Sequence, residues 1–390
     1  MIKILIVGMP FSIHMYRWIN NFQSEKFDIH IYSSMAYQSS LFSKFKDITF
    51  HCNKYFINHP LEKVKYSPID KLGFVNFGSV KLNKIFEKGV RFLGLESNIS
   101  DGLCKVIKTV KPDIVHTMES QHAGYLMSDV LSLNTFKSFK WVHSVWGIDF
   151  HYFLTQKGHK ESLSKMLNGV DELIIEGTRD KKLALKLGYT NNVNIMQCTG
   201  GYKKEQLGLR RKHKENRNVI LLKGYSEYPR MGLNGLFALE ECSKEIKEGG
   251  LRVLVYSSDE TMKNEVFKVK SRTGIDILCA EEMSHEEFLE INRQAICSIT
   301  VNDTDGMPNT MLDAMMCGAF PIQSKTSCAS DIITNGVNGY LVDPKDSNQL
   351  KTAILSVIKN TKVREEAKSI NLNIILEKYN WDNYRKVNGN

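Results

Sequence analysis

Short apolar runs alternate with segments of helical period along most of this 390-residue chain. Each run ends at a polar or glycine-containing turn and precedes apolar residues spaced as on one face of a helix. This alternation predicts parallel sheets with helices on both faces, in a doubly wound α/β architecture. The predicted strands lie at residues 2–7, 27–33, 111–116, 140–145, 171–176, 218–222, 251–257, 275–278 and 295–301.

The length predicts two domains, because 390 residues exceed one ordinary domain and suffice for two cores of roughly 150–200 residues each. We expect a first Rossmann-like domain at 1–197, a hinge at 198–217, a second Rossmann-like domain at 218–362, and a terminal helical segment at 363–390. The hinge contains Gly200 and Gly201 followed by a basic, polar run. Glycine pairs suit a hinge because they adopt backbone angles that other residues resist.

The net charge of +9 belongs mainly to the first half, where residues 1–200 hold 25 Lys and Arg against 17 Asp and Glu. No recognition helix, zinc finger or RNP-like pattern accompanies this charge, so we expect no nucleic-acid partner. A helix predicted at 81–93 instead carries Lys81, Lys84, Lys88 and Arg91 within one ~80° sector. That pattern favours binding of the helix to an anionic membrane surface. The alternative is an ordinary surface helix packed on the core.

The eight cysteines show no C-x-x-C spacing and mostly lie in apolar runs, which is typical of reduced, buried thiols. The first ten residues form a short apolar run without a cleavage site, and no stretch approaches the ~18 apolar residues of a spanning helix. We therefore expect a cytoplasmic protein. If the basic helix binds a membrane, the protein attaches peripherally to the inner face of the cell membrane.

The segment from 295 to 344 is the most informative part of the chain. A buried-strand run stops at a polar turn, and a helix then begins at Asn309. The turn brings Asp305 and Gly306 to a strand's carboxyl end, beside a helix amino terminus whose free N–H groups favour a phosphate. Asp313 lies one turn into the same helix. A solvated loop acid and an ordinary helix carboxylate remain the alternative interpretation.

This segment resembles the sugar-nucleotide site of GT-B glycosyltransferases of the family-4 type. In that family a strand is followed by E-x7-E and then by G-x-P-[VI]; here the acids are Asp305 and Asp313, and the small-residue turn is 317–322. The resemblance implies that Asp305 contacts the donor sugar and Asp313 the nucleotide ribose. It also implies a donor site lined by the residues that follow the first acid, namely Gly306, Met307, Pro308 and Asn309.

The same resemblance implies two facing Rossmann-like domains and a terminal helix that returns to the first. In the larger family, the turn after the second domain's first strand carries an Arg and a Lys. They neutralise the donor diphosphate because negative charge grows on the leaving group. Here Tyr225 replaces that Arg, and we expect Lys223, Gly224 and Arg230 to bind the phosphates. Two solvated loop cations are the alternative.

Two motifs of the first half resemble loops of the same family. Residues 12–19 (SIHMYRWI) resemble the opening loop that borders the donor phosphates and the acceptor, which makes Ser12, His14 and Arg17 candidates for that side of the site. The alternative for His14 is a residue that caps or packs the first helix. No G-x-G-x-x-G is present, so a dinucleotide site is a poor interpretation.

Further along, the pattern KPDIVH…QHAGYL and the later W-G-x-D also resemble this family. The resemblance makes His122 and Asp149 candidate catalytic or acceptor contacts. For Asp149 the alternative is a loop-capping carboxylate.

The resemblance implies a retaining transferase that moves a sugar from a nucleotide-diphosphate donor to a hydroxyl of a glycan or lipid-linked glycan, in surface polysaccharide, lipopolysaccharide or capsule synthesis. Residues 303–305 spell D-x-D, a manganese signature of another glycosyltransferase fold, but they lie too late in the chain for it. We therefore expect no essential metal and no other cofactor. The alternatives are a sugar-nucleotide 2-epimerase of the same fold and a non-catalytic glycan-binding or scaffold protein.

Overall fold

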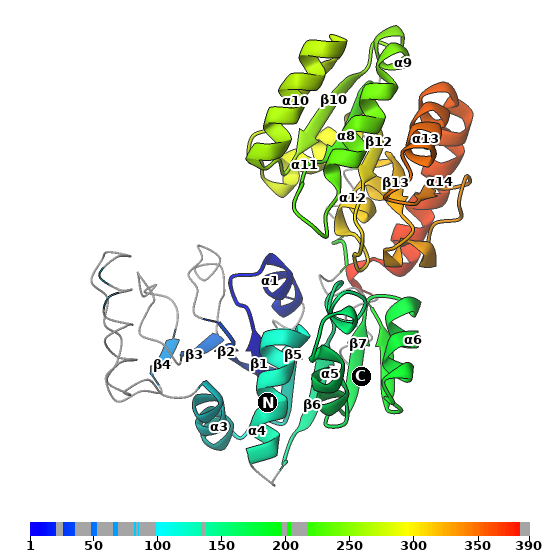
Figure 1. Cartoon of the computed structure of the whole chain (residues 1–390). Coiled ribbons are helices and arrows are strands. Elements are labelled where there is room, and N and C mark those ends of the chain that lie inside the picture. Colours follow the sequence, from blue (N-terminus) through cyan, green and yellow to red (C-terminus); the bar gives the residue numbers. More distant parts are fainter. Residues whose placement is uncertain are drawn as a thin grey trace. The chain divides into compact units, whose positions relative to one another are not determined.

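The computed structural model describes residues 1–20, 26–35, 48–52, 65–68, 82, 85, 99–133, 137–196, 201–203 and 217–382. The chain forms two compact units, Met1–Gly200 and Gly201–Asn390, each built on its own sheet (Figure 1). The predicted basic helix at 81–93 lies outside the described residues except for Leu82 and Ile85, whose side chains are exposed. None of the helices in the described ranges is long and apolar enough to cross a membrane.

Unit 1 contains a parallel sheet with the strand order β4-β3-β2-β1-β5-β6-β7-β8 among its described residues. Its strands are β1 (Ile2–Gly8), β2 (Phe27–Ser33), β3 (Ile48–Cys52), β4 (Lys65–Pro68), β5 (Ile114–Met118), β6 (Lys140–Ser144), β7 (Glu172–Ile175) and β8 (Asn192–Ile195). Its helices are α1 (Ile13–Ile19), α3 (Ile99–Val110), α4 (Tyr125–Leu133), α5 (His159–Leu167) and α6 (Thr178–Lys186), with a π-helical turn at Ser120–Gly124 and a 3₁₀ turn at Phe153–Thr155.

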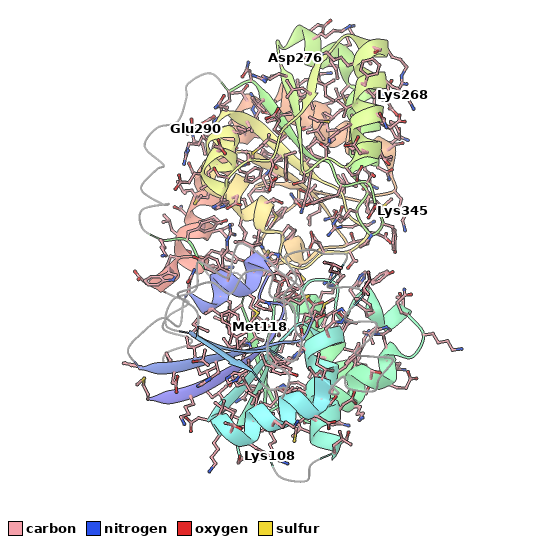
Figure 2. The ribbon with its side chains drawn as sticks, turned by 90° about the vertical axis from the view of Figure 1, so that its left-hand side faces the viewer. Lys108, Met118, Lys268, Asp276, Glu290 and Lys345 are labelled. Carbon is pink, nitrogen blue, oxygen red and sulfur yellow. The ribbon has the colours of Figure 1, made fainter. Side chains whose placement is uncertain are left out.

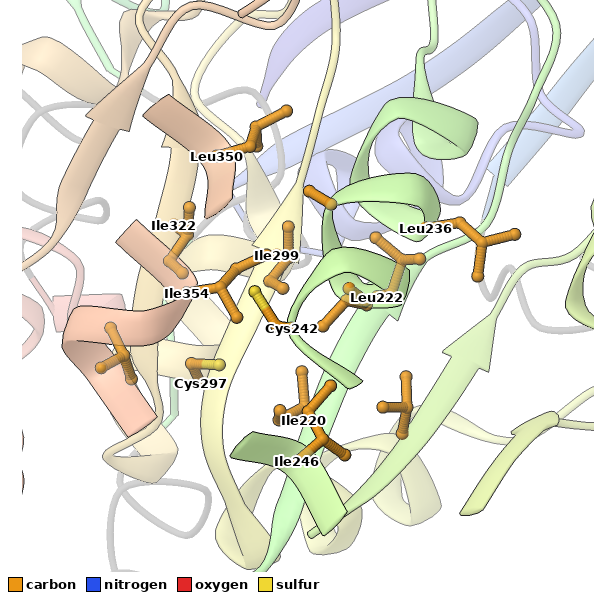
Figure 3. Close-up of a cluster of buried hydrophobic side chains, with 14 of the residues drawn as sticks. Ile220, Leu222, Leu236, Cys242, Ile246, Cys297, Ile299, Ile322, Leu350 and Ile354 are labelled. Carbon is orange, nitrogen blue, oxygen red and sulfur yellow. The ribbon is translucent and has the colours of Figure 1, made fainter. Parts of the chain in front are cut away.

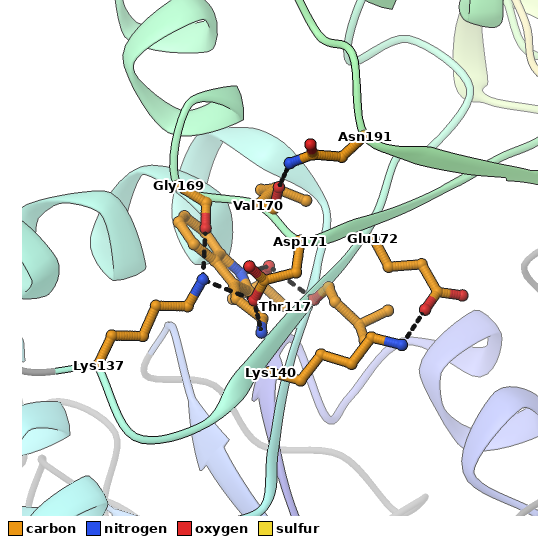
Figure 4. A network of polar contacts seen from close by, with 10 residues as sticks. Thr117, Lys137, Lys140, Gly169, Val170, Asp171, Glu172 and Asn191 are labelled. Carbon is orange, nitrogen blue, oxygen red and sulfur yellow. Dashed lines mark hydrogen bonds and ion pairs between the residues drawn. The ribbon is translucent and has the colours of Figure 1, made fainter.

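Polar contacts secure the entry to β6 and β7 at the opposite edge of this sheet from its carboxyl ends (Figure 4). Lys137 forms an ion pair with Asp171 at 2.6 Å, and Lys140 forms another with Glu172. The Trp141 indole N–H donates to the Thr117 hydroxyl at 2.8 Å, deep in the sheet. These contacts fix β5, β6 and β7 relative to one another, so the loops at their carboxyl ends are held by a rigid frame.

Unit 2 contains a parallel sheet with the order β11-β10-β9-β12-β13-β14. Its strands are β9 (Val219–Lys223), β10 (Arg252–Tyr256), β11 (Asp276–Cys279), β12 (Ala295–Thr300), β13 (Phe320–Ser324) and β14 (Tyr340–Val342). Its helices are α8 (Gly232–Glu241), α9 (Ser243–Glu248), α10 (Glu260–Thr273), α11 (His285–Gln294), α12 (Asn309–Cys317), α13 (Ser347–Lys359) and α14 (Thr361–Lys378), with a 3₁₀ turn at Cys328–Asp331.

Strand β9 is buried on both faces, which explains its continuous apolar sequence. Ile220 and Leu222 join a core with residues of α8, α10 and α13. Figure 3 shows both near Leu236 of α8 and Ile354 of α13. Val219 and Leu221 point the other way, into a second core with Phe288 and Ala314 of α11 and α12. The expected architecture of two doubly wound parallel α/β units is confirmed.

Helix α11 begins at a capping box whose residue types are already visible in the sequence. The Ser284 side chain accepts from the Glu287 N–H, and the Glu287 carboxylate binds the Ser284 N–H in return. The return of the terminal helix to the first domain stays a prediction, because residues 383–390 lie outside the described residues. Within unit 2, α14 packs against α12 and α13, and Asn371 of α14 hydrogen-bonds the buried Asn338.

We predict that Ile299→Ala lowers the free energy of unfolding of unit 2 by about 2–5 kcal/mol, because it leaves a cavity between β9 and β13. Ile299 is fully buried, opposite Leu222 on one side and Ile322 on the other. Urea unfolding followed by circular dichroism would measure the loss. The matched variant Ile299→Val should cost only about 0.5–1.5 kcal/mol, and equal losses for both variants would contradict this packing.

Candidate active site

Each sheet has one position where the strand order reverses. In unit 1 it lies between β1 and β5, and in unit 2 between β9 and β12. Loops leave the two neighbouring strands in opposite directions at such a switch point, which opens a crevice at the carboxyl edge where ligands of α/β sheets bind. Most of the site residues predicted from the sequence lie in the loops, or in the first turns of the helices, that follow β1, β5, β6, β9 and β12. The exceptions are Lys223, which ends β9, Arg17 in the last turn of α1, and Asp313 in the second turn of α12.

In unit 2 the loops after β9 and β12 are joined by backbone hydrogen bonds. The Met231 N–H donates to the Val301 carbonyl at 2.8 Å, and Arg230 pairs with Asn302 in an isolated antiparallel bridge. The Asn302 side-chain amide then donates to Asp305 Oδ2 at 2.8 Å. The structure therefore brings two of the predicted residues, Arg230 and Asp305, to one short stretch of this edge.

Two cations lie over a single aromatic ring in the loop after β9. The Lys223 ammonium is 5.9 Å and the Arg230 guanidinium 4.6 Å from the centre of the Tyr225 ring. An aromatic face attracts cations without neutralising their charge. Tyr225, which replaces the family's arginine, therefore holds both cations together at the switch point, an arrangement suited to a diphosphate.

A glycine is required beside these cations. A Cβ on Gly224 would lie 2.7 Å from Val255 Cγ1 and 2.9 Å from the Ser258 hydroxyl. Its N–H donates to the Tyr256 carbonyl at 2.7 Å. Gly224 therefore keeps the loop tight against β10, and its phosphate contact stays a prediction.

The carboxylate of Asp305 is oriented at both oxygens. The Gly306 N–H donates to Oδ1 at 2.9 Å, while Asn302 binds Oδ2. Met307 and Pro308 are buried behind it, and Asn309 begins α12. Pro308 provides no side-chain cap for this helix. Asp305 is half-buried, so its carboxylate is fixed in direction and still accessible to a ligand.

Asp313 has a different environment from Asp305. Its residue is only 4 % exposed. Its Oδ1 accepts the Tyr202 hydroxyl at 2.8 Å, and the His285 Nε2 lies 3.2 Å from Oδ1 and 3.1 Å from Oδ2. The ribose contact implied for Asp313 stays a prediction, and any ligand there meets a carboxylate with two protein partners.

The first acid of the D-x-D run is engaged by neighbours in unit 2. Asp303 forms an ion pair with Lys345, labelled in Figure 2, at 2.8 Å, and accepts the Tyr228 hydroxyl at 2.7 Å. No group of three or more His, Cys, Asp or Glu residues within the described ranges is arranged to hold a metal ion.

In unit 1 the loop after β1 leads directly into α1. Ser12 caps this helix, since its hydroxyl accepts from the His14 N–H at 3.2 Å. The His14 ring meets the Trp146 ring edge-on, with centroids 5.6 Å apart, and so connects the loops after β1 and β6. Arg17 lies in the last turn of α1. Ser12 thus caps the helix and His14 contacts Trp146, and the ligand roles of both residues stay predictions.

Sequence reasoning missed Glu119. This residue directly follows Met118, which ends β5 and is labelled in Figure 2. Glu119 adopts a positive φ of 73° and is only 4 % exposed. Its Oε1 accepts from the His122 and Ala123 N–H groups at 2.5 and 2.8 Å, which shapes the π-helical turn and presents an exposed His122 side chain. The signal in the sequence was an acid placed directly after a buried strand.

Asp149 completes a pair of buried carboxyl groups. Its Oδ2 accepts from the Ser120 and Trp146 N–H groups at 2.8 and 2.9 Å. The Gln121 amide nitrogen, oriented by its partners, donates to Asp149 Oδ1 at 3.1 Å and to Glu119 Oε2 at 3.2 Å. The loop-capping role considered for Asp149 is therefore present, and the same residue also belongs to a carboxyl pair beside His122.

Burial controls protonation in this network. Burial and the nearby Glu119 charge raise the pKa of Asp149 well above its ordinary value, and burial also raises the pKa of Glu119. Behind them, His143 contacts the Thr117 and Ser120 hydroxyls at 2.8 and 3.1 Å, and burial lowers its pKa to about 3. The imidazole is therefore neutral at pH 7, and the proton that the site can exchange belongs to the carboxyl pair.

This carboxyl pair predicts a pH dependence of stability. A carboxyl group whose pKa is raised on folding retains its proton in the folded state, so its contribution to stability falls as pH rises from the unfolded pKa of about 3.9 through the raised value. Asp149→Asn preserves the acceptor at Oδ2 and removes the titration. Urea titrations would measure the free energy of unfolding of the wild type and of Asp149→Asn. We expect the wild-type value minus the variant value to fall between pH 4 and neutrality.

Asp129→Asn is the matched control, because Asp129 is an exposed acid on the neighbouring helix α4. The difference in the free energy of unfolding between Asp129→Asn and the wild type should change little between pH 4 and neutrality. Parallel stability curves for the wild type and Asp149→Asn would rule out a raised pKa at Asp149.

Both halves of the chain match models of glycosyltransferase families. Residues 77–176 match the model described as Glycosyl transferase 4-like, and residues 258–372 match Glycosyl transferases group 1. The chain is 24% identical over 217 residues to the uncharacterized glycosyltransferase MJ1178 of Methanocaldococcus jannaschii, a match covering 51% of this chain and 59% of that protein. The uncharacterized glycosyltransferase MJ1069 of the same organism matches 86 residues at 28% identity, which is 21% of this chain and 22% of that protein. These matches span less than two thirds of both relatives.

Solved structures extend the likeness to the whole fold. The crystal structure of Anabaena Alr3699/HepE in complex with UDP has a TM-score of 0.70 at 11% identity and covers 100% of this chain and 98% of that one. Sucrose-phosphate synthase from Thermosynechococcus elongatus has a TM-score of 0.65 at 12% identity, with the same coverage. At such identities the likeness shows the fold. The chain thus has a GT-B fold, and one segment in each half of it matches a glycosyltransferase family model.

Proposed function

We propose that this protein is a retaining glycosyltransferase that moves a sugar from a nucleoside-diphosphate donor to a hydroxyl of a glycan or lipid-linked glycan. The observation that carries this proposal is the junction of the loops after β9 and β12. There two cations, Lys223 and Arg230, lie over one aromatic ring, and Arg230 pairs with the residue that orients Asp305. The two matched glycosyltransferase models support it independently.

The donor's charged and hydroxyl-bearing parts have suitable partners at this edge. Lys223 and Arg230 would bind the diphosphate, whose negative charge grows as the sugar departs. Asp305 would accept hydrogen bonds from the sugar's hydroxyl groups, since its carboxylate is fixed and accessible. The Anabaena structure was solved in complex with UDP-glucose as well as UDP, and we propose a UDP-sugar as the first donor to test.

Retention is proposed without an enzymic nucleophile. The acceptor hydroxyl would attack on the face that the leaving phosphate vacates, and a phosphate oxygen would take the hydroxyl proton. The C–O bond to the phosphate breaks as the new glycosidic bond forms, so no metal or other cofactor is required. Cations that stabilise the departing diphosphate serve this mechanism directly.

The acceptor side is assigned to unit 1. His122 is exposed on a turn whose backbone Glu119 fixes, and Asp149 anchors the same turn through Ser120. We propose His122 as the acceptor contact, with Asp149 as a positioning residue and Ser12, His14 and Arg17 bordering the same side. Synthesis of a surface polysaccharide, such as lipopolysaccharide or capsule, would supply such an acceptor.

A transfer assay tests the proposed function. Purified protein would be incubated with UDP-, GDP- and dTDP-sugars, with and without EDTA and a mixed glycolipid extract, and released nucleoside diphosphate would be measured. We expect release that requires the extract, survives EDTA and falls at least a hundredfold in Asp305→Ala.

Asp303→Asn is the matched control, since it alters the neighbouring acid of the D-x-D run and preserves its contact with Tyr228. It should lose far less activity than Asp305→Ala. Loss of activity in EDTA and in Asp303→Asn would contradict metal-independent transfer. Conversion of a sugar nucleotide to its 2-epimer without extract would favour an epimerase, and binding without turnover would favour a scaffold.

The lipid-linked acceptor motivates a second test, on the predicted basic helix at 81–93. We expect the chain to sediment with vesicles containing phosphatidylglycerol and not with neutral vesicles. Each surface lysine contributes about 1 kcal/mol to such binding. The double variant Lys84→Glu, Lys88→Glu should therefore lose at least ~2 kcal/mol, or about thirtyfold in partition coefficient.

The matched control is Lys181→Glu, Lys182→Glu, which reverses two exposed charges on α6. Equal losses in both double variants would show that only the net charge matters. Equal binding to neutral and anionic vesicles would exclude an electrostatic surface.

A further inference from the structure

The short side chain of Asp313 changes what this acid can reach. It lies in the second turn of α12, and its carboxylate is 5 % exposed. Its Oδ1 receives both the Tyr202 hydroxyl and the His285 Nε2, and Oδ2 receives His285 as well. A carboxylate has about four lone-pair sites. Protein donors thus engage both oxygens of Asp313, and little of its surface is left for a ligand.

His285 extends from this carboxylate toward the ligand edge of unit 2. It is the first residue of α11, whose amino terminus follows β11, so it lies on the carboxyl side of the sheet. Helix α11 packs against α12, β9 and β12, the two strands that flank the switch point. The His285 side chain is 30 % exposed, six times the exposed fraction of its partner Asp313. The imidazole is therefore the accessible member of the pair.

The hydrogen bond to Asp313 also sets the chemistry of the other ring nitrogen. An imidazole that donates its Nε2–H to a carboxylate carries a lone pair on Nδ1 in its neutral form. That nitrogen accepts a hydrogen bond from a hydroxyl group. In a nucleoside diphosphate whose phosphates lie at Lys223 and Arg230, the hydroxyl groups of the nucleoside are those of the ribose.

We propose that His285, held in place by Asp313, is the residue that recognises a ribose hydroxyl of the donor nucleotide. This inference rests on the proposed nucleoside-diphosphate site. His285 is the contacting group, and Asp313 is a positioning residue that acts through it. The replacement of a longer carboxylate by aspartate leaves room for the imidazole, which supplies the reach that aspartate lacks.

Binding of ribose and deoxyribose nucleotides tests the inference with a readout independent of turnover. Calorimetry would compare UDP with 2′-deoxy-UDP and 3′-deoxy-UDP on the full chain, and the GDP series would be used if UDP does not bind. We expect the wild type to prefer the ribonucleotide over one deoxy analogue by about three- to tenfold, the value of one hydrogen bond. In His285→Ala this preference should fall to about one, while affinity for that deoxy analogue stays unchanged.

Two further variants test whether the loss of preference comes from the lost acceptor of His285 or from a disturbed helix start. His285→Gln keeps an acceptor oxygen and should restore part of the preference. Glu286→Ala alters an exposed neighbour on the same turn of α11 and should retain the full preference. Thermal unfolding of each variant shows whether it is folded before binding is measured.

A double-mutant cycle decides how Asp313 acts. If it acts only through His285, Asp313→Asn lowers the preference in the wild type and has no further effect in His285→Ala. A further loss in the His285→Ala background would assign the ribose contact to Asp313 itself and overturn the inference. Equal binding of ribo- and deoxynucleotides by the wild type would overturn it and leave the donor site intact, whereas no nucleoside diphosphate binding at all would overturn the proposed function as well.

Discussion

The pairing of β9 with β12 is the constraint on which the candidate donor site depends. Both strands are buried along their length, and their register aligns Leu221 with Ser298 and Leu222 with Ile299. Because successive side chains fill opposite cores, a shift of one residue would exchange the two faces of each strand. The apolar pattern therefore fixes the register, and the register determines which loop residues meet. Arg230 pairs with Asn302 because the strands beneath them have a fixed alignment.

Four candidate acids, Asp305 and Asp313 in unit 2 and Asp149 and Glu119 in unit 1, differ in environment more than in chemistry. Asp305 is half-buried and bound by an amide and a backbone N–H. Asp313 and Asp149 are both buried. Asp149 accepts from uncharged N–H, hydroxyl and amide donors, and a second carboxyl group, Glu119, lies beside it. Desolvation and like charge both favour the protonated form. An accessible carboxylate suits ligand binding, whereas a buried pair suits the anchoring of a turn.

The sequence predicted the architecture well because apolar periodicity reports burial directly. Strands 2–7 and 27–33, the helix that begins at Asn309 and the capping box at Ser284 all follow from local patterns. Five strands were not predicted, namely β3, β4, β8, β13 and β14. β3 and β4 lie in an aromatic, lysine-rich region where no alternation is evident. Strands at or near the edge of a sheet depend on their neighbours for pairing, and that information is absent from a local window.

The predicted site residues were located by motif, but motifs did not reveal which partners each residue has. Glu119 was passed over because its role depends on a positive φ and on two N–H groups of the following turn, features that no spacing rule encodes. His285 belongs to none of the motifs that located the other candidates. Its relation to Asp313 joins residues 28 positions apart through the packing of α11 on α12.

The chain departs from the pattern of the glycosyltransferase family that it resembles at Tyr225 and at Asp313, and each of these residues has a charged or polar neighbour in contact with it. Tyr225 stands where an arginine is usual, and its ring carries the two cations that remain. Asp313 stands where that family has a glutamate, and the His285 imidazole lies 3.1 Å from its Oδ2. At Tyr225 the lost positive charge is accompanied by Lys223 and Arg230, and at Asp313 the shorter side chain is accompanied by His285. Two such compensations around one switch point favour a working nucleotide site over a fold that has lost its ligand, because a site without function has no need to preserve charge and reach together.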